Sequence, residues 1–265
     1  MHFVLSGEEA DMAEGKILMV DDDKEIADLV EIHLKGEGYQ VYKAYNGKEA
    51  VELVGSMKVH LVVMDIMMPV MDGFALLKKV KTEIEFSHIP VILLTAKNTM
   101  QSRLEGLELG ADAYLDKPFS TNLLMAQISN LISNRDNIRK FYFNSPIANM
   151  KSMAYTKADE SFLEKLNEII NEHIGNPALD VNMIADLMHL SRPTLYRKIR
   201  AISNLTPNEL IKISRLKKAA ELLIQGNMKI YEISEATGFS SQSYFWSAFI
   251  KQFGMSPSNY AKENK

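Results

Sequence analysis

Four short apolar runs, each ended or followed by a polar residue, constrain the fold of this chain most strongly. The residues at these ends are Asp21 with Asp22, Asp65, Thr95 and Lys117. Near-continuous apolar runs of this length are typical of strands that are buried on both faces of a parallel sheet. Because open α/β sheets build their sites at the carboxyl ends of such strands, we expect these polar groups to converge on one pocket.

Residues 16–134 alternate between strand and helix patterns. Strands are predicted at residues 16–20, 40–44, 59–65, 91–94 and 113–116, and a helical pattern follows each of them. Five strands joined by five crossover helices predict an α/β domain with a parallel sheet covered on both faces. We expect the flavodoxin-like strand order 2-1-3-4-5, in which the switch point between the first and third strands lies beside Asp21 and Asp65.

From about residue 158 the pattern is helical to the end of the chain. A helix, a tight turn and a second helix occur twice, at residues 181–202 and 230–253. A longer helix is predicted between them, from Pro207 to about Ile224, with proline in its first turn. These segments predict an all-α domain at residues 159–265, after a linker at residues 135–158 that is rich in Asn and Ser.

Composition excludes several classes of protein. The chain has 265 residues, enough for two domains, and no cysteine, so neither disulfides nor Cys-based zinc sites are available. Residues 1–15 form a polar, acidic tail without the features of a secretory signal, and no apolar stretch approaches the length of a membrane span. We therefore expect a cytoplasmic protein whose present segment makes no membrane contact.

The net charge of −4 hides an asymmetry between the two halves. Residues 1–150 carry 15 basic and 22 acidic residues, whereas residues 151–265 carry 15 basic and 12 acidic residues. Between Arg192 and Lys218 there are eight basic residues and one acidic residue, Glu209. Such a local excess of positive charge favours binding to a polyanion over an ordinary solvated helix face.

The polar residues at the strand ends suit phosphoryl transfer, which asks a protein mainly for position and charge. Asp65 could supply a carboxylate nucleophile, and Asp21, Asp22 and Asp65 offer the oxygen ligands that Mg²⁺ prefers. Lys117 could hold a phosphoryl oxygen as a point charge, and Thr95 could donate from its hydroxyl. The alternative is that these residues are unrelated caps, the role that we assign to Asp23 and Asp72.

Residues 16–134 resemble a two-component receiver domain. The resemblance rests on Asp21-Asp22, on the run from Asp65 to Gly73, on Leu94-Thr95-Ala96 and on Asp116-Lys117-Pro118-Phe119. It implies that Asp65 accepts a phosphoryl group from a histidine of a sensor kinase. It also implies a Mg²⁺ shell completed by the backbone carbonyl of Met67, and a switch in which Thr95 and Tyr114 move toward the phosphorylated site.

The two helical units predict DNA binding, because the second helix of a helix–turn–helix enters the major groove. Ser191 is a candidate N-cap of the first such helix. Its outward residues are predicted to be Arg192, Thr194, Tyr196, Arg197 and Arg200. In the second unit the candidates are Ser241, Gln242, Ser243 and Ser247. We expect the first unit and the longer helix from Pro207 to supply most of the phosphate affinity, because Lys251 is the only basic residue of the second recognition helix.

Residues 162–260 resemble the DNA-binding domain of the AraC/XylS family. The resemblance rests on three runs, Gly238 to Phe245 with Phe249, Phe253 to Tyr260, and Ser191 to Ile199, and on Leu205-Thr206-Pro207 at the start of the connecting helix. It implies two units held by that helix and bound in successive major grooves. One departure is Ser247, where many relatives have a basic residue.

The two domains together resemble the C-terminal end of hybrid two-component systems of Bacteroidetes, and a free-standing response regulator is the alternative. We expect phosphorylation to pair two receivers into a homodimer on operator DNA. The chain itself is not expected to be an enzyme beyond promoting its own phosphotransfer and dephosphorylation. Two competing hypotheses are a Mg²⁺-dependent phosphohydrolase, for which Met67 stands where a second acid is needed, and a phosphate sink whose helical half binds only protein.

Overall fold

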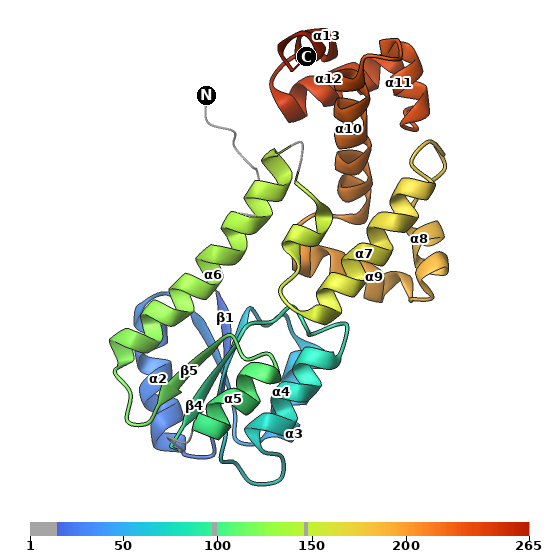
Figure 1. Cartoon of the computed structure of the whole chain (residues 1–265). Coiled ribbons are helices and arrows are strands. Elements are labelled where there is room, and N and C mark those ends of the chain that lie inside the picture. Colours follow the sequence, from blue (N-terminus) through green and yellow to red (C-terminus); the bar gives the residue numbers. More distant parts are fainter. Residues whose placement is uncertain (1–14, 97–99, 146–147, 265) are drawn as a thin grey trace. The chain divides into compact units, whose positions relative to one another are not determined.

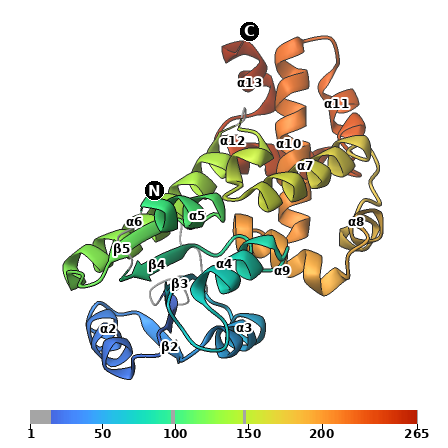
Figure 2. The same cartoon turned by 60° about the horizontal axis from the view of Figure 1, so that its bottom comes forward.

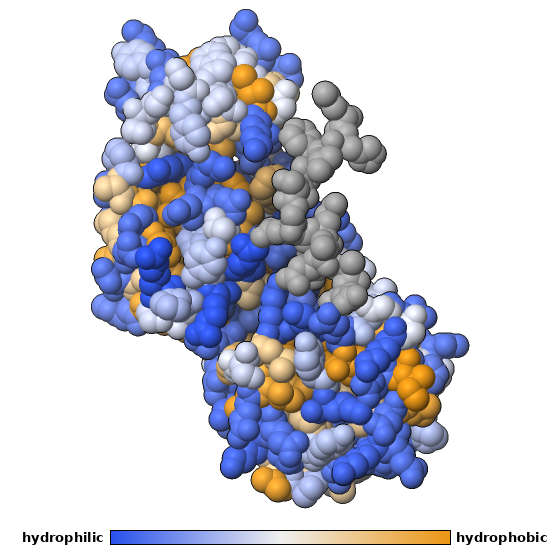
Figure 3. Space-filling view, turned by 180° about the vertical axis from the view of Figure 1, so that it is seen from behind, coloured by the Kyte–Doolittle hydropathy of each residue, from blue (hydrophilic) through white to orange (hydrophobic). Residues whose placement is uncertain are grey.

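The computed structural model describes residues 15–96, 100–145 and 148–264, and the predicted tail, except Gly15, lies outside them. The chain divides into two units, Met1–Arg135 and Asp136–Lys265, which we describe separately. On the face shown in Figure 3, hydrophilic side chains separate the hydrophobic patches from one another. No helix in the described part of the chain is both long and apolar enough to cross a bilayer.

The first unit contains a five-stranded parallel sheet in the order β2-β1-β3-β4-β5, which confirms the predicted topology. The strands are β1 (Lys16–Val20), β2 (Gln40–Ala44), β3 (Leu61–Asp65), β4 (Val91–Thr95) and β5 (Ala113–Asp116). Strand β1 pairs with β2 on one side and with β3 on the other. The strands after β2 are therefore added on the opposite side of β1, and the order of the sheet reverses between β1 and β3. This is the switch point at which open α/β sheets form their sites.

Helices cover both faces of this sheet, as Figures 1 and 2 show. They are α2 (Lys24–Gly36), α3 (Gly47–Ser56), α4 (Gly73–Thr82), α5 (Met100–Glu108) and α6 (Thr121–Asn144). Alternate residues of β1 enter opposite cores: Leu18 and Val20 pack with α3 and α4, whereas Ile17 and Met19 pack with α2 and α6. The period of two along a strand therefore explains why the central strands β1, β3 and β4 are apolar at nearly every position.

The second unit is all-α, as predicted. After the last turns of α6 it contains η1 (Met150–Met153), α7 (Lys157–Glu172), α8 (Val181–Met188), α9 (Arg192–Ser203), α10 (Pro207–Gln225), α11 (Ile230–Ala236), α12 (Gln242–Phe253) and α13 (Pro257–Glu263). Helices α8 and α9 form the first helix–turn–helix, and α11 and α12 form the second. Figure 1 shows α10 running between them, with α7 to α9 around one half of it and α11 to α13 around the other.

Local capping explains where these helices begin. The Ser191 hydroxyl accepts a hydrogen bond from the backbone N–H of Thr194 and so caps α9. Thr206 and Glu209 form a capping box at the start of α10, and Pro207 occupies the first turn. The sequence signals for these two helices were therefore sufficient to place both starts.

Two separate hydrophobic cores lie along α10. Leu210, Ile211 and Ile213 of α10 belong to a core with α7, α8 and α9, which we call the first lobe. Leu216, Ala219 and Leu223 belong to a core with α11, α12 and α13, which we call the second lobe. Each helix–turn–helix thus has its own core, and α10 is shared by both.

The region expected to be a linker contains regular structure. Helix α6 continues through Asn144, and Tyr142 is 2% exposed in the core of the first lobe. Met150 and Met153 of η1 are buried in the same core. The linker was predicted from the frequency of Asn, Ser and Pro, with Phe141-Tyr142-Phe143 expected to dock on one neighbour. Of these aromatic residues Tyr142 is buried in the core, whereas Phe141 and Phe143 are exposed.

Candidate functional site

Polar residues end or follow four of the five strands of the parallel sheet. Asp21 follows β1, Asp65 ends β3, Thr95 ends β4, and Lys117 follows β5. Carboxylate oxygens of Asp21, Asp22 and Asp65 all lie within 4.8 Å of one another. The expected convergence of the three carboxylates is therefore present at the carboxyl edge of the sheet.

Lys117 is the cation of this cluster. Its Nζ lies 2.8 Å from Oδ2 of Asp21 and 3.3 Å from Oδ1 of Asp65. The backbone N–H of Lys117 donates to the carbonyl of Thr95 over 2.7 Å, which ties the residue to the end of β4. Backbone pairing therefore fixes the position from which the side chain reaches across to β1 and β3.

Burial governs the electrostatics of Asp65, which is 5% exposed. Burial raises the pKa of the Asp65 carboxyl, the Lys117 ammonium opposes that rise, and the negative charge of Asp21 adds to it. For Lys117, burial acts to lower the pKa, but the hydrogen bond and charge of Asp21 and the charge of Asp65 outweigh it and raise the pKa. The pocket thus holds a charged lysine between two buried carboxylates.

The cluster fits a divalent cation. It combines three carboxylates with one ammonium group, so negative charge is in excess. Among the described residues, the buried Oδ1 of Asp65 accepts no well-directed hydrogen bond, although Lys117 Nζ lies 3.3 Å away. Oxygen ligands around a net negative charge are what Mg²⁺ prefers. A buried carboxylate oxygen with unused acceptor capacity is also what a cation ligand requires.

The loop after Asp65 depends on a close backbone approach at Gly73. A Cβ atom at Gly73 would lie 2.3 Å from the carbonyl oxygen of Asp65, so no other residue fits there without a shift of the loop. Asp72 accepts from the backbone N–H of Ala75 and caps α4, and Asp23 caps α2, as expected for both. Met67 lies within this loop, and its side chain is exposed. Sequence reasoning treated Gly73 only as a helix start and missed its contact with the backbone of Asp65.

Thr95 and Tyr114 lie on β4 and β5. Thr95 is fully buried. Tyr114 is half-buried, and a Cβ atom at Gly106 of α5 would lie 1.4 Å from its hydroxyl oxygen. Burial raises the pKa of the Tyr114 hydroxyl. Gly106 therefore creates the space that Tyr114 fills, a role that no sequence pattern indicated.

Helix α9 presents the residues expected on its outer face. Arg192, Tyr196 and Arg197 are exposed, and Thr194 and Arg200 are half-buried. The basic surface is smaller than the sequence count indicated, because two of its eight cations are internal. Lys198 is fully buried in an ion pair with Asp159 of α7, and Lys217 of α10 is 7% exposed.

Helix α12 presents a weakly charged outer face. Ser241 caps the helix, and Gln242, Ser243 and Ser247 are exposed, while Phe245 and Phe249 are fully buried. Tyr244 is also exposed, at 54%, although sequence reasoning did not single it out. Since it lies in the first turn of α12, it joins the candidate contact residues of this helix.

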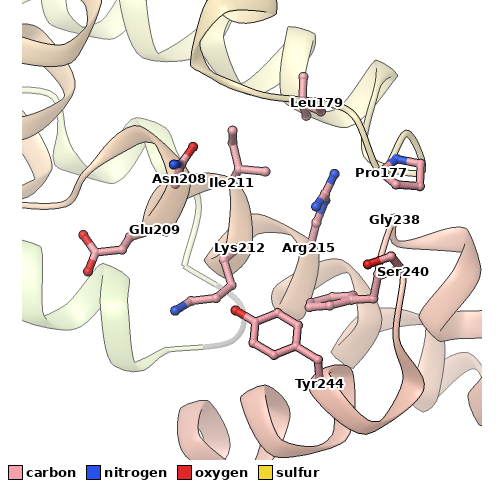
Figure 4. Close-up of a pocket in the computed structure, with 11 residues that line it drawn as sticks. Pro177, Leu179, Asn208, Glu209, Ile211, Lys212, Arg215, Gly238, Ser240 and Tyr244 are labelled. Carbon is pink, nitrogen blue, oxygen red and sulfur yellow. The ribbon is translucent and has the colours of Figure 1, made fainter.

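A cleft of about 290 Å³ lies over α10, between the α7–α8 loop and the α11–α12 turn, and Figure 4 shows its lining. Lys212 and Tyr244 reach into it from α10 and α12. Arg215 donates from Nη2 to the carbonyl of Asn176 over 2.6 Å, and its guanidinium packs against Gly238, where a Cβ atom would lie 3.0 Å away. Arg215 thereby binds the two lobes to each other, and Lys212 is left as the half-buried cation of the cleft.

Comparison with known proteins matches each unit separately. Residues 17–129 match the model of the response regulator receiver domain, and residues 184–263 match a helix-turn-helix domain of the AraC type. The curated protein "Histidine kinase P4" of Formosa agariphila is 37% identical over 244 residues, which is 92% of this chain. The match spans only 18% of that relative's length.

Solved receiver domains are similar to the first unit. The receiver domain of the Francisella response regulator 1452 is 36% identical and covers 46% of this chain and 98% of its own, with a TM-score of 0.44. A signal receiver domain of a histidine kinase from Syntrophus aciditrophicus is 35% identical and covers 45% and 91%, also with a TM-score of 0.44. By the two family models, this chain joins a response regulator receiver domain to a helix-turn-helix domain of the AraC type.

Proposed function

We propose that this chain is a transcription regulator whose DNA binding is controlled by phosphorylation of Asp65. The observation that carries the proposal is the buried cluster of Asp21, Asp65 and Lys117 in the same chain as two helix–turn–helix units. A receiver joined to such a domain is typical of non-enzymatic transcription regulators. We retain residues 16–134 and 159–265 as the limits of the two functional domains.

Phosphoryl transfer at this site needs a nucleophile and fixed charge. A carboxylate oxygen of Asp65 attacks the phosphorus of a phosphohistidine on the sensor kinase. The new P–O bond forms as the P–N bond breaks, and the imidazole leaves with the electron pair. The Lys117 ammonium, already 3.3 Å from Asp65, holds an oxygen of the incoming group, and the Thr95 hydroxyl donates to another. Mg²⁺ held by Asp21, Asp22, Asp65 and the carbonyl of Met67 would neutralise phosphoryl charge.

The response to phosphorylation is a shift in population toward a paired receiver. Movement of Thr95 and Tyr114 toward the modified Asp65 would change the surface of α5, β5 and α6. The exposed side chains of Leu104 and Leu107 on α5 support a dimer interface on that surface. Pairing would raise the effective concentration of the DNA-binding domains at adjacent sites.

The proposed DNA contacts lie on the outer faces of α9 and α12. Arg192, Thr194, Tyr196, Arg197 and Arg200 would contact one major groove, and Ser241, Gln242, Ser243 and Ser247 the next. Arginines can read guanine edges in pairs of hydrogen bonds or hold phosphates. Because α9 carries three arginines, the first unit would supply most of the affinity.

The place of this chain in a longer protein is also a proposal. The match to 18% of the length of a histidine kinase supports a place within a longer hybrid two-component protein. We propose that this chain is the C-terminal part of such a protein and that it acts in the cytoplasm. A free-standing response regulator paired with a separate sensor kinase remains the alternative. Mapping the start of the gene distinguishes them.

The test is DNA binding with and without a phosphodonor. The full chain is incubated with a random pool of double-stranded DNA, with Mg²⁺ and either beryllofluoride or buffer, and bound sequences are determined. We expect beryllofluoride to strengthen binding to the enriched sequences and to produce dimers in light scattering. A chain that stays monomeric and enriches no sequence in either condition would contradict the proposal.

A further inference from the structure

The last turns of α6, residues 136–144, form hydrogen bonds with three helices of the DNA-binding domain. We call this segment the α6 arm. It contacts α9 through Arg139, α10 through Lys217, and α12 through Gln252. The arm lies outside the stretch that matches the helix-turn-helix model, which begins at residue 184. Its contacts nevertheless include both candidate recognition helices.

Arg139 closes the C-terminal end of α9. Its Nη2 donates to the carbonyl of Ala201 over 2.6 Å, and its Nε donates to the carbonyl of Ile202 over 2.9 Å. The last four carbonyls of a helix have no partner within the helix, and the helix dipole places negative charge at that end. The Arg139 guanidinium therefore donates to two carbonyls at the end of α9 and also places a positive charge beside the negative end of its dipole.

Lys217 holds the end of the arm against α10. Its Nζ donates to the carbonyls of Tyr142, Ser145 and Ala148 over 2.7, 2.8 and 2.9 Å. The ammonium also lies 3.8 Å from the centre of the Tyr142 ring. Burial lowers the pKa of Lys217 to about 8, so the charged form still predominates near neutral pH. Three carbonyl acceptors and an aromatic face compensate this buried charge.

Gln252 connects the arm to the second lobe. Its Nε2 donates to the carbonyl of Phe143 over 2.7 Å, and it lies one residue before the end of α12. The arm thus accepts hydrogen bonds from α12 and α10 and donates to α9. Tyr142, between these contacts, is buried in the core of the first lobe.

The two lobes have separate cores, so few features fix the distance and angle between α9 and α12. One is the shared helix α10, and another is the close approach of Gly175 to the carbonyl of Ala236 and of Gly238 to the carbonyl of Ile174. The α6 arm is a further connection, and it reaches the C-terminal ends of both recognition helices. A bridge at those ends would limit rotation of one lobe against the other about α10.

We infer that Arg139, Lys217 and Gln252 are positioning residues that set the spacing between the two recognition helices. This inference rests on the proposed function, because spacing matters only if both helices enter DNA. It predicts that loss of these contacts relaxes the preferred distance between half-sites while each half-site sequence stays the same. The functional DNA-binding domain would then include the α6 arm, which lies outside the residues that match the helix-turn-helix model.

The experiment uses the full chain and a random pool of double-stranded DNA, and it records the distance between the paired half-sites that each variant enriches. The variants are Arg139→Met and Gln252→Leu, and the matched control is Lys140→Met, which removes a charge from an exposed position on the same arm. The wild type and the control should enrich one spacing. The two variants should enrich the same half-sites over several spacings and bind the best duplex roughly 3- to 10-fold more weakly.

Folding is followed through Trp246, the only tryptophan of the chain, which lies on α12. If Arg139→Met alters its emission, Arg139→Lys, which keeps one donor, should restore the emission and narrow the spacing again. A single unchanged spacing in folded Arg139→Met and Gln252→Leu would overturn the inference and leave the proposed function intact. If the wild type enriches no DNA, both are overturned.

Discussion

The receiver pocket and the outer faces of α9 and α12 differ in how far their charged and polar side chains are exposed to water. In the pocket, Asp21 and Asp65 are almost fully buried, and Lys117 lies within 3.3 Å of both. On α9, Arg192 and Arg197 are exposed to water. Charges at low exposure interact strongly with one another, whereas exposed charges are screened by water and salt.

This difference affects what a single substitution can do. Loss of Lys117 would leave the buried carboxylates of Asp21 and Asp65 without their cation, and loss of the Asp65 carboxylate would remove the proposed nucleophile. The proposed DNA-binding surface would spread its contacts over two helices with separate cores, so loss of one contact would leave the rest in place. We therefore expect nearly complete loss of function in the first region and graded loss in the second.

The largest effect is expected from Asp65→Asn. An amide cannot attack phosphorus, so capture of label from acetyl phosphate in the presence of Mg²⁺ should fall to background. Asp72→Asn is the matched control, because Asp72 caps α4 outside the carboxylate cluster and asparagine caps equally well. Equal labelling of Asp65→Asn and the parent would show that the acceptor is elsewhere.

Lys117→Met should destabilise the receiver by about 3 kcal/mol in the absence of divalent cations, because Asp21 and Asp65 would remain buried without their cation. Addition of Mg²⁺ should restore part of the loss, since the carboxylate cluster would bind it. Chemical denaturation with and without Mg²⁺ measures both quantities. A loss below about 1 kcal/mol, or no response to Mg²⁺, would show that the stability of the receiver does not depend on the charge of Lys117 beside Asp21 and Asp65.

Arg197→Ala should weaken DNA binding by about 1–3 kcal/mol if Arg197 reads a base, and it should leave Asp65 labelling unchanged. Lys165→Ala is the control, because Lys165 is an exposed cation on α7 in the same domain. Binding is measured by fluorescence anisotropy with an enriched duplex at several salt concentrations. An effect no larger than that of Lys165→Ala would remove Arg197 from the proposed contacts.

Gln242→Ala should have the smallest effect, below about 1 kcal/mol, because α12 carries one basic residue against three arginines on α9. The same anisotropy measurement compares the loss of DNA-binding free energy in Gln242→Ala with the loss in Arg197→Ala. A larger loss for Gln242→Ala than for Arg197→Ala would reverse the proposed order of the two recognition helices and make the second lobe the main reader.

Sequence patterns predicted much of this molecule for identifiable reasons. The strands β1, β2 and β5 begin and end at the predicted residues, and β3 and β4 differ from the predicted bounds by two residues and one residue. Helix α10 has both a capping box and a proline in its first turn, so its start was well specified. The strand order followed from the alternation of strands and helices, which permits few topologies.

The prediction was less complete where a residue's role depends on a distant neighbour. Gly73 and Gly106 are needed because Asp65 and Tyr114, each eight residues away on another element, approach them in the folded chain. Lys198 was counted as part of a basic surface, yet it is buried against Asp159, 39 residues away. A lysine on a helix carries no local sign of whether it faces water or an acid on another helix.

The amino-acid sequence by itself determined the order of strands and helices, the polar residues at the strand ends and the two helix–turn–helix units. These are local properties, set by apolar periodicity, capping and turn residues. The tertiary structure alone decided which cations are internal, which glycines are required and that the end of α6 joins both recognition helices. Those outcomes depend on long-range packing and on unpaired carbonyls at helix ends, whose donors come from elsewhere in the chain.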